Sequence, residues 1–260
     1  MKTAVVLGWP VEHSQSPAMM NAAFAARGIS AEMIRVGVPP EAVAAKLAEL
    51  RALPILGASV TIPHKLAAHA LADELTPAAR AIGAVNCLAW DGARLVGHNT
   101  DAPGFVDAAR AAGIVLAGAR VVVLGAGGAA RAVAYGCGEA GAEVDVVARD
   151  PARVAWCRAQ PWSSLAELFA RAALVVDCTS AGLGDDREFV ASLPLDALGS
   201  TATVATLVYH ATTNLLERAS ARGHSILDGR AMLVHQGARA FTLWTGVEAP
   251  LDEMAAALRA

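Results

Sequence analysis

The sequence predicts an α/β protein with two domains, and three observations lead to this prediction. The chain has 260 residues, enough for two domains of ordinary size. Hydrophobic residues make up 55% of it and aromatic residues only 5%, which suits Ala-rich helices packed on buried Val- and Leu-rich strands. Short apolar runs alternate with helical patterns, which predicts mostly parallel sheets. We therefore expect an N-terminal open α/β domain, a second doubly wound domain, and C-terminal helices that pack back on the first domain.

The first half of the chain consists of strand, loop and helix units. Residues 3–8 form an apolar run that ends in Gly-Trp-Pro, which indicates a strand entering a loop. Ser16 and Pro17 are typical of an N-cap followed by the first helical position. The same reasoning predicts strands at 32–36 and 57–62, helices at 40–50, from 63 and from 76, a hairpin of 84–90 and 94–98 around Asp91-Gly92 at the sheet edge, and a helix ending at 112.

The second half restarts at residue 120 with the pattern of a nucleotide-binding domain. We expect strands at 120–124, 143–148, 174–178 and 203–208, and helices at 129–140, from 151, at 230–246 and at 251–258. The domain boundaries predicted from this pattern are residues 1–102, completed by 231–260, for a substrate-binding and catalytic domain, and 103–230 for a cofactor-binding domain.

Composition excludes several classes of function. The formal net charge of −3, without a block of basic residues, argues against nucleic-acid binding. Apolar stretches are interrupted before they reach roughly 18 residues, and the first residues lack a signal-peptide pattern, so we expect a cytoplasmic protein without a membrane span. The four cysteines and the histidines lack metal-ligand spacing, so no metal is expected. A small molecule is the expected partner of a monomer or homodimer.

The strongest motif is a glycine-rich turn at the end of the strand predicted at 120–124. Gly125, Ala126, Gly127, Gly128 and Ala129, followed by Ala130, fit G-x-G-x-x-G/A and open a predicted helix. Gly125 permits the tight turn, Gly127 lets backbone N–H groups approach a pyrophosphate, and the helix N-terminus stabilises negative charge. A purely structural turn is the alternative, and the strand-to-helix context favours dinucleotide binding.

The end of the next predicted strand discriminates between NADP and NAD. Arg149 and Arg153 are suited to bracket a 2′-phosphate, and no carboxylate occupies the strand end itself. Asp150 keeps NAD possible, because a carboxylate there would bind an unphosphorylated ribose. An alternative role for Asp150 is to cap a helix that begins at Pro151. We predict NADP as the cofactor.

Polar clusters follow the predicted strand ends of the first half, where open α/β sheets bind ligands. Each cluster alone has an ordinary explanation, such as a helix cap, a solvated lysine or a strand edge. The clusters are His13-Ser14-Gln15-Ser16-Pro17, Ser59-Val60-Thr61-Ile62-Pro63-His64-Lys65, Gly83-Ala84-Val85-Asn86 and Asn99-Thr100-Asp101.

In this order, the clusters and the glycine-rich turn resemble the shikimate dehydrogenase family, whose pattern runs H-S-x-S-P, N-V-T-x-P-x-K, G-A-V-N, N-T-D and G-A-G-G-A. The resemblance continues through Arg149, Thr179-Ser180-Ala181-Gly182, Val208-Tyr209 and the segment from Gly229 to Gly246, and thus covers nearly the whole chain. It implies an NADP-dependent oxidoreductase that interconverts 3-dehydroshikimate and shikimate, a small hydroxylated cyclic carboxylic acid.

The resemblance also implies a role for particular residues. Lys65 and Asp101 would be the catalytic pair, with the Lys65 ammonium stabilising the developing alkoxide and transferring its proton while Asp101 orients it. The substrate carboxylate would be held by Ser14, Ser16 and Tyr209, and the ring hydroxyls by Thr61, Asn86, Asp101 and Gln236. The cofactor would contact Gly125, Ala126, Gly127, Gly128, Ala129, Arg149, Arg153, Thr179 and Gly229.

Three positions depart from the family pattern. Ser59 stands where the family usually has Asn, Met20 where it has His, and Thr206 where it has Asp. Because a serine hydroxyl is shorter than a carboxamide and has one donor instead of two, Ser59 would change how a ring hydroxyl is held. The alternatives are therefore a paralogue acting on quinate or another ring acid, with NAD or NADP, and a non-catalytic cofactor or metabolite sensor. Retention of Lys65 and Asp101 argues against the sensor.

Overall fold

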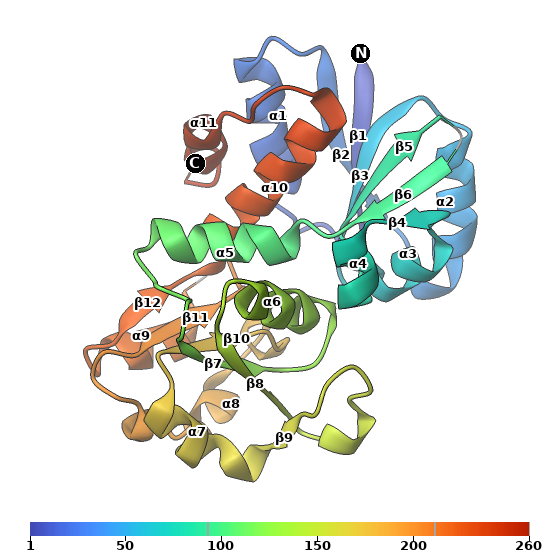
Figure 1. Ribbon diagram of the computed structural model, residues 1–260. Coiled ribbons are helices and arrows are strands. Elements are labelled where there is room, and N and C mark those ends of the chain that lie inside the picture. Colours follow the sequence, from blue (N-terminus) through green and yellow to red (C-terminus); the bar gives the residue numbers. More distant parts are fainter. Residues whose placement is uncertain (93, 211, 260) are drawn as a thin grey trace. The chain divides into compact units, whose positions relative to one another are not determined.

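The computed structural model describes residues 1–92, 94–210 and 212–259, and it confirms the α/β class (Figure 1). The chain forms two compact units, each with its own six-stranded sheet. Unit 1 consists of Met1–Gly104 and Leu233–Ala260, and unit 2 of Phe105–Met232. The N-terminal and C-terminal parts of the chain thus build one unit together.

The sheet of unit 1 has the strand order β2-β1-β3-β5-β6-β4. Its strands are β1 (Lys2–Gly8), β2 (Ala31–Gly37), β3 (Ile55–Val60), β4 (Glu74–Leu75), β5 (Cys87–Asp91) and β6 (Arg94–His98). β1 pairs in parallel with β2 and β3, whereas β5 is antiparallel to both β3 and β6. The predicted β5–β6 hairpin is present, but its predicted place at the edge is wrong because β4 pairs with β6 outside it. A strand of two residues is too short to leave a periodic signal.

The helices of unit 1 are α1 (Ser16–Ala26), a 3-10 turn η1 (Pro40–Ala42), α2 (Val43–Arg51), α3 (Lys65–Leu71), α4 (Pro77–Ile82) and α11 (Leu251–Ala256), together with the start of α5 (Asp101–Ala111) and most of α10 (Gly229–Thr245). The N-cap predicted at Ser16 is wrong by one position, since Ser16 is the first helical residue. The Ser14 hydroxyl, which accepts from the Ser16 N–H at 3.4 Å, supports this entry instead.

The C-terminal helices pack on unit 1 as predicted. α11 packs against α1. The Trp244 indole of α10 lies directly over Gly57 of β3, where an added Cβ would fall 2.2 Å from Nε1. That Nε1 donates a hydrogen bond of 3.0 Å to the Leu88 carbonyl of β5. The buried indole therefore has its one polar atom satisfied while it fills the space that the missing glycine side chain leaves.

The sheet of unit 2 is entirely parallel, with the order β12-β11-β10-β7-β8-β9. Its strands are β7 (Arg120–Leu124), β8 (Glu143–Ala148), β9 (Gln160–Pro161), β10 (Leu174–Asp177), β11 (Thr203–Thr206) and β12 (Ser225–Leu227). Read from β9, this is the order 3-2-1-4-5-6 of a doubly wound dinucleotide-binding fold, and the strand order reverses between β7 and β10. Val121 to Leu124 are almost fully buried, as strands covered on both faces require.

The helical elements of unit 2 are α6 (Gly128–Glu139), η2 (Pro151–Arg153), η3 (Trp162–Ser164), α7 (Leu165–Arg171), η4 (Ala181–Leu183), α8 (Arg187–Ala191), η5 (Leu195–Ala197) and α9 (Asn214–Ser220). The helix predicted from Pro151 is wrong, because only one 3-10 turn forms there. Asp150 does not cap it with its side chain. β11 ends two residues before the predicted point, since the Thr206 hydroxyl accepts from the Val208 N–H at 3.3 Å and turns the chain.

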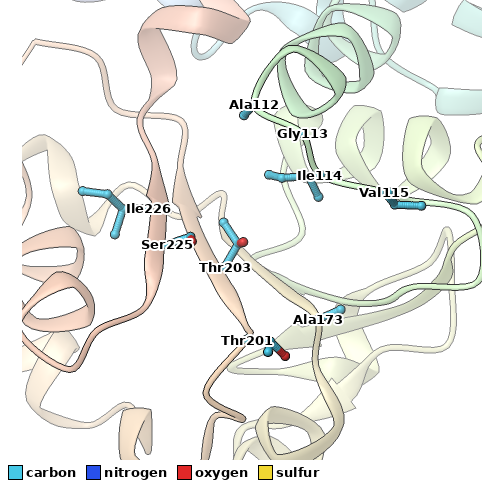
Figure 2. Close-up of a pocket in the computed structure, with 9 residues that line it drawn as sticks. All are labelled: Ala112, Gly113, Ile114, Val115, Ala173, Thr201, Thr203, Ser225 and Ile226. Carbon is cyan, nitrogen blue, oxygen red and sulfur yellow. The ribbon is translucent and has the colours of Figure 1, made fainter.

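A surface pocket of about 290 Å³ lies at the amino ends of the strands of unit 2 (Figure 2). Its walls come from the segment before β7 and from the starts of β10, β11 and β12. The lining residues are Ala112, Gly113, Ile114, Val115, Ala173, Thr201, Thr203, Ser225 and Ile226. Ligands of open α/β sheets bind at the opposite, carboxyl ends of the strands, so we do not assign a dinucleotide to this pocket.

Candidate active site and cofactor site

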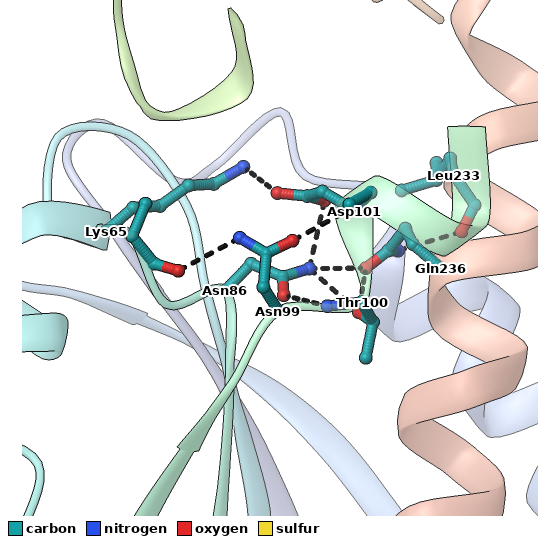
Figure 3. Close-up of polar contacts among 9 residues, drawn as sticks. Lys65, Asn86, Asn99, Thr100, Asp101, Leu233 and Gln236 are labelled. Atoms are coloured by element: carbon teal, nitrogen blue, oxygen red, sulfur yellow. Dashed lines mark hydrogen bonds and ion pairs between the residues drawn. The ribbon is translucent and has the colours of Figure 1, made fainter. Parts of the chain in front are cut away.

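The centre of the polar site in unit 1 is an ion pair between Lys65 and Asp101 (Figure 3). Lys65 is the first residue of α3 and Asp101 the first residue of α5. Lys65 Nζ lies 2.6 Å from Asp101 Oδ2, and the two side chains are only 14% and 7% exposed. Because the pair is largely withdrawn from water, removing either partner would leave an uncompensated buried charge.

Asn86 holds the second oxygen of Asp101. Its Nδ2 donates to Asp101 Oδ1 at 2.9 Å, and the same amide group lies 2.8 Å from Thr100 Oγ1 and 3.2 Å from Gln236 Oε1. Its Oδ1 accepts from the Thr100 N–H at 2.6 Å. The carboxylate of Asp101 is thus fixed on one side by a cation and on the other by a buried carboxamide, which sets its orientation.

Asn99 leaves the Asp101 carboxylate available for Lys65. Asn99 Oδ1 accepts from the Ala102 N–H at 3.1 Å, and its Nδ2 donates to the Ala84 carbonyl at 2.9 Å. This bond to the first turn of α5 is the one that an N-cap side chain would make. The ordinary explanation of Asp101 as a helix cap is therefore wrong. The sequence placed Asn99 and Asp101 in the same cluster, but it did not show that Asn99 bonds to the start of α5 while Asp101 pairs with Lys65.

Gln236 reaches the network from α10, where its Nε2 donates to the Leu233 carbonyl at 2.8 Å. The approach requires a glycine on α5. A Cβ added to Gly104 would lie 2.7 Å from both the backbone N and the Cβ of Gln236. Gly104 was not singled out from the sequence, because nothing local marks a helical glycine as a contact point between two helices.

Ser14, Ser16 and Thr61 follow the carboxyl ends of the neighbouring parallel strands β1 and β3. Ser14 and Ser16 are each 7% exposed. Arg35 of β2 fixes their loop, since its Nε and Nη2 donate to the Ser14 carbonyl at 3.0 and 2.6 Å. In the described structure, no hydrogen bond joins these three side chains to the Lys65 network. Their contact with a substrate stays a prediction.

The remaining residues singled out from the sequence have varied surroundings. Tyr209 belongs to unit 2, where its ring meets the His210 ring edge-on at a centroid distance of 5.9 Å. Met20 is 1% exposed within the core of unit 1. Ser59 is half-buried on β3 opposite Cys87 of β5. The carboxylate-binding role of Tyr209 stays a prediction.

The glycine-rich turn in unit 2 has the shape that a pyrophosphate needs. Gly125 has a φ of 105°, and a Cβ there would lie 3.2 Å from the Cys178 carbonyl. Gly127 is the N-cap of α6, and nothing lies within 4 Å of the position that its Cβ would take. The first N–H groups of α6, from Gly128 and Ala129, have no partner within the helix, and the space beside Gly127 is open.

Arg149 and Arg153 lie exposed after β8, at the position expected for a ribose phosphate. Within the described ranges, no carboxylate oxygen lies within ion-pair distance of either guanidinium. Asp150 between them is exposed as well. Two unpaired guanidinium groups beside a single carboxylate fit a 2′-phosphate better than an unphosphorylated ribose.

Thr179 and Gly229 have structural partners of their own. The Thr179 N–H donates to Asp177 Oδ1 at 2.9 Å, and Thr179 Oγ1 accepts from the Ala181 N–H at 3.2 Å. A Cβ on Gly229 would lie 2.2 Å from the Leu207 carbonyl oxygen, so close packing alone requires glycine there.

Asp177 is 2% exposed, and its burial raises the pKa of its carboxyl group. The sequence did not indicate that Asp177 is buried. An aspartate at the end of an apolar strand can point into solvent or into the protein, and no local pattern distinguishes the two.

Two observations concern other classes of site and are limited to the described residues. No group of three or more His, Cys, Asp and Glu side chains is arranged so as to hold a metal ion. No helix combines the length and the apolar character that crossing a bilayer demands.

The doubly wound unit with its open glycine-rich turn, and the Lys65–Asp101 pair of the other unit, define a class of protein: the dinucleotide-dependent oxidoreductases. Comparisons with known proteins narrow this class. Residues 6–88 match the model of the shikimate dehydrogenase substrate binding domain, and residues 229–259 match that of the shikimate 5′-dehydrogenase C-terminal domain.

Individual relatives agree. The shikimate dehydrogenase (NADP(+)) of Symbiobacterium thermophilum is 43% identical over 96% of this chain and 90% of its own length. The shikimate 5-dehydrogenase of Thermus thermophilus, solved with NADP(H) and shikimate, has a TM-score of 0.89 at 40% identity, covering 100% of this chain and 99% of its own. The Aquifex aeolicus shikimate dehydrogenase has a TM-score of 0.93 at 31% identity, covering 100% and 98%. The chain belongs to the shikimate dehydrogenase family.

Proposed function

We propose that this protein catalyses the reversible, NADP-dependent interconversion of shikimate and 3-dehydroshikimate. The observation that carries the proposal is the Lys65–Asp101 ion pair, which is largely buried, has an Nζ–Oδ2 distance of 2.6 Å and is held by Asn86. The relatives support the substrate and the cofactor, since a Thermus thermophilus homologue was solved with both NADP(H) and shikimate. The protein is thus an oxidoreductase that acts on a CH–OH group.

Lys65 handles the proton. In the reducing direction its ammonium donates to the carbonyl oxygen as negative charge develops there, and in the oxidising direction its amine accepts the hydroxyl proton. Asp101 keeps the ammonium in place with Oδ2 and has Oδ1 fixed by Asn86, so the donor is oriented before the substrate arrives. The bound cofactor would supply the redox chemistry, with NADPH as hydride donor in the reducing direction and NADP⁺ as hydride acceptor in the oxidising direction.

The substrate is a small ring that carries a carboxylate and several hydroxyls. The hydroxyls of Ser14, Ser16 and Tyr209 hold the carboxylate, and Thr61, Asn86, Asp101 and Gln236 bind the ring hydroxyls. Support for this assignment comes from the hydrogen bonds that link Asn86, Asp101 and Gln236, and from the position of Ser14, Ser16 and Thr61 after neighbouring parallel strands.

The cofactor is held by the second unit. Residues 103–230 form the NADP-binding domain, and residues 1–102 with 231–260 form the substrate-binding and catalytic domain. In this assignment Gly125 to Ala129 bind the pyrophosphate, Arg149 and Arg153 bind the 2′-phosphate, and Thr179 and Gly229 complete the site. The open space at Gly127 and the unpaired guanidinium groups support it.

Steady-state oxidation of shikimate and of quinate, each with NADP and with NAD, tests the proposal on the wild-type protein. We expect the highest kcat/KM for shikimate with NADP. Turnover of quinate that exceeds that of shikimate would contradict the proposed substrate, and a preference for NAD would contradict the proposed role of Arg149 and Arg153. Cofactor binding without turnover of either acid would contradict an enzymatic function on these acids.

A further inference from the structure

Trp156 bonds directly to the glycine-rich turn of unit 2. It lies between η2 and β9, in the segment where the sequence predicted a helix. Its indole Nε1 donates to the carbonyl of Ala126 at 3.2 Å. Since Ala126 stands between Gly125 and Gly127, this bond fixes the middle of the turn and aims its neighbouring N–H groups. The helix predicted from Pro151 gives way to a chain path that delivers the indole to the turn.

Arg131 lies against the same indole. It is in the first turn of α6, where its backbone N–H donates to the Gly127 carbonyl at 3.0 Å. Its guanidinium carbon lies 5.5 Å from the centroid of the Trp156 ring. This geometry is a cation–π contact. A helical side chain leans toward the N-terminus of its helix, so the guanidinium is held near the end of α6 that faces the turn.

The charge of Arg131 lacks a counter-charge. Its Nε is shielded from solvent without a hydrogen-bond partner, and within the described ranges no carboxylate lies at ion-pair distance from the guanidinium. Burial is the main cause of a lowered pKa of the Arg131 guanidinium. A half-buried cation without an anion is costly, and a buried donor left unpaired adds to that cost.

We propose that Arg131, held in place by Trp156, binds a phosphate group of the dinucleotide. The proposal rests on the proposed NADP-dependent function and deepens it. A guanidinium matches phosphate oxygens with two parallel donors, and it stacks on an aromatic ring while doing so, which an ammonium does less well. Trp156 is a positioning residue that acts on both the guanidinium and the Ala126 carbonyl.

NADP carries two phosphate groups that Arg131 could bind, the pyrophosphate and the 2′-phosphate. The pyrophosphate is expected at the N-terminus of α6, to which Arg131 belongs. The 2′-phosphate is expected beside Arg149 and Arg153, at the start of the loop that carries Trp156. NAD contains only the first of these groups, so comparing NADP with NAD identifies which one Arg131 binds.

Calorimetric titration with NADP and with NAD, in the absence of any ring acid, tests the proposal on the full chain. For Arg131→Met we expect the Kd for NADP to rise roughly tenfold or more, the usual scale for losing a hydrogen bond to a charged group. Arg131→Lys should recover part of this loss, because the charge returns without the planar fork. An equal rise with NADP and NAD would assign the pyrophosphate, and a rise with NADP alone the 2′-phosphate.

Variants of Trp156 separate positioning from general damage. Trp156→Phe keeps a ring under Arg131 but removes the donor to Ala126, so we expect a smaller rise in Kd than in Trp156→Ala. Trp162→Phe is the matched control, because Trp162 packs on Phe189 in the same unit and is not part of the turn. Thermal unfolding identifies variants that are not folded. An unchanged Kd for both dinucleotides in folded Arg131→Met and Arg131→Lys would overturn the proposal, whatever the wild type does with shikimate.

Discussion

Lys65 and Asp101 meet at 2.6 Å although 36 positions separate them in the sequence, and each is the first residue of its helix. The chain between them runs through α3, β4, α4 and the β5–β6 hairpin, and it returns to the same end of the sheet because β3 and β6 are both antiparallel to β5. The geometry therefore depends on the antiparallel pairing of β5 with β3 and β6 as much as on the two residues. It also explains why Asn86, which precedes β5, and Thr100, which follows β6, lie side by side and share hydrogen bonds.

Replacement of Asn86 should separate the orientation of the Asp101 carboxylate from the proton transfer by Lys65. Asn86→Ala leaves Asp101 Oδ1 and the Thr100 N–H without a partner, so we expect a loss of roughly 1–3 kcal/mol in unfolding free energy. We also expect kcat to fall, because Asp101 is no longer fixed. Asn86→Asp, the same size, keeps an acceptor for Thr100 but places a second carboxylate beside Asp101. Full activity of Asn86→Asp at neutral pH would contradict the proposed role of the carboxamide.

Gly104→Ala tests the contact between α5 and Gln236. The new Cβ would lie 2.7 Å from the Gln236 backbone, so the helix must shift, and overpacking of this kind costs roughly 1–3 kcal/mol. We expect a lower Tm and a higher KM for shikimate. Gly138→Ala in α6 is the control, because nothing lies within 4 Å of its Cβ and alanine favours a helix by roughly 0.5–1 kcal/mol. Equal stability changes at the two sites would contradict the contact.

Asp177→Asn should stabilise the protein at neutral pH. Burial is the main cause of the raised pKa of Asp177, with a contribution from buried Asp186, so its ionised form is unfavourable in the folded state. When the pKa of a group is raised in the folded state, its protonated form stabilises the folded protein at low pH. This stabilisation is lost as the pH rises through the folded-state pKa. We expect a gain of roughly 1 kcal/mol for Asp177→Asn at pH 7, the usual scale of a single substitution, that disappears as pH falls toward the ordinary pKa of Asp.

Asp185→Asn gives the opposite sign and serves as the control. Arg187 lowers the pKa of the exposed Asp185 carboxyl to about 2. Its contribution to stability is present above the ordinary pKa of Asp and is lost as pH falls through the lowered value, so the variant should be slightly less stable at pH 7. Thermal unfolding from pH 4 to pH 8 distinguishes the two variants. A gain for Asp177→Asn that does not depend on pH would contradict burial of an ionised carboxylate.

Arg149→Gln and Arg153→Gln together should lower the preference for NADP. Removing two unpaired guanidinium groups should raise the KM for NADP by roughly tenfold or more, because each would lose its proposed charge-assisted bond to the 2′-phosphate. The KM for NAD should change little. Arg171→Gln in α7 is the control, since Arg171 pairs with Glu167 on the surface of the same helix. A parallel rise for NADP and NAD would place these arginines elsewhere than at the 2′-phosphate.

Much of the fold could be predicted because local patterns specify it. β7 and β8 have the predicted bounds, since each is an apolar run that begins two residues after a turn glycine, Gly118 or Gly141. β4 and β9 have two residues each and leave no pattern. The helix predicted from Pro151 failed because Trp156 bonds to Ala126, a tertiary contact that overrides helix propensity.

The candidate site shows the same division. Lys65, Asn86, Asp101 and Gln236 were predicted together from a resemblance, and the structure joins all four by hydrogen bonds. Sequence reasoning did not show that Asn99 caps α5, since Asn99 and Asp101 are both common caps. Arg131 and Trp156 escaped notice as well. An arginine in a helix and a tryptophan in a loop carry no signal of a shared site in the sequence, because only the structure shows that the guanidinium lies against the indole.

The central claim is that Lys65 transfers the proton, and the most direct measurement of it is single-turnover reduction of 3-dehydroshikimate by NADPH in Lys65→Met, with shikimate binding measured separately. We predict that the rate of the chemical step falls roughly 10²- to 10⁴-fold, the usual contribution of a general acid, while the Kd for shikimate changes by only a few-fold. A chemical step as fast as in the wild type, with the whole defect in the Kd for shikimate, would contradict the claim and leave Lys65 as a binding residue.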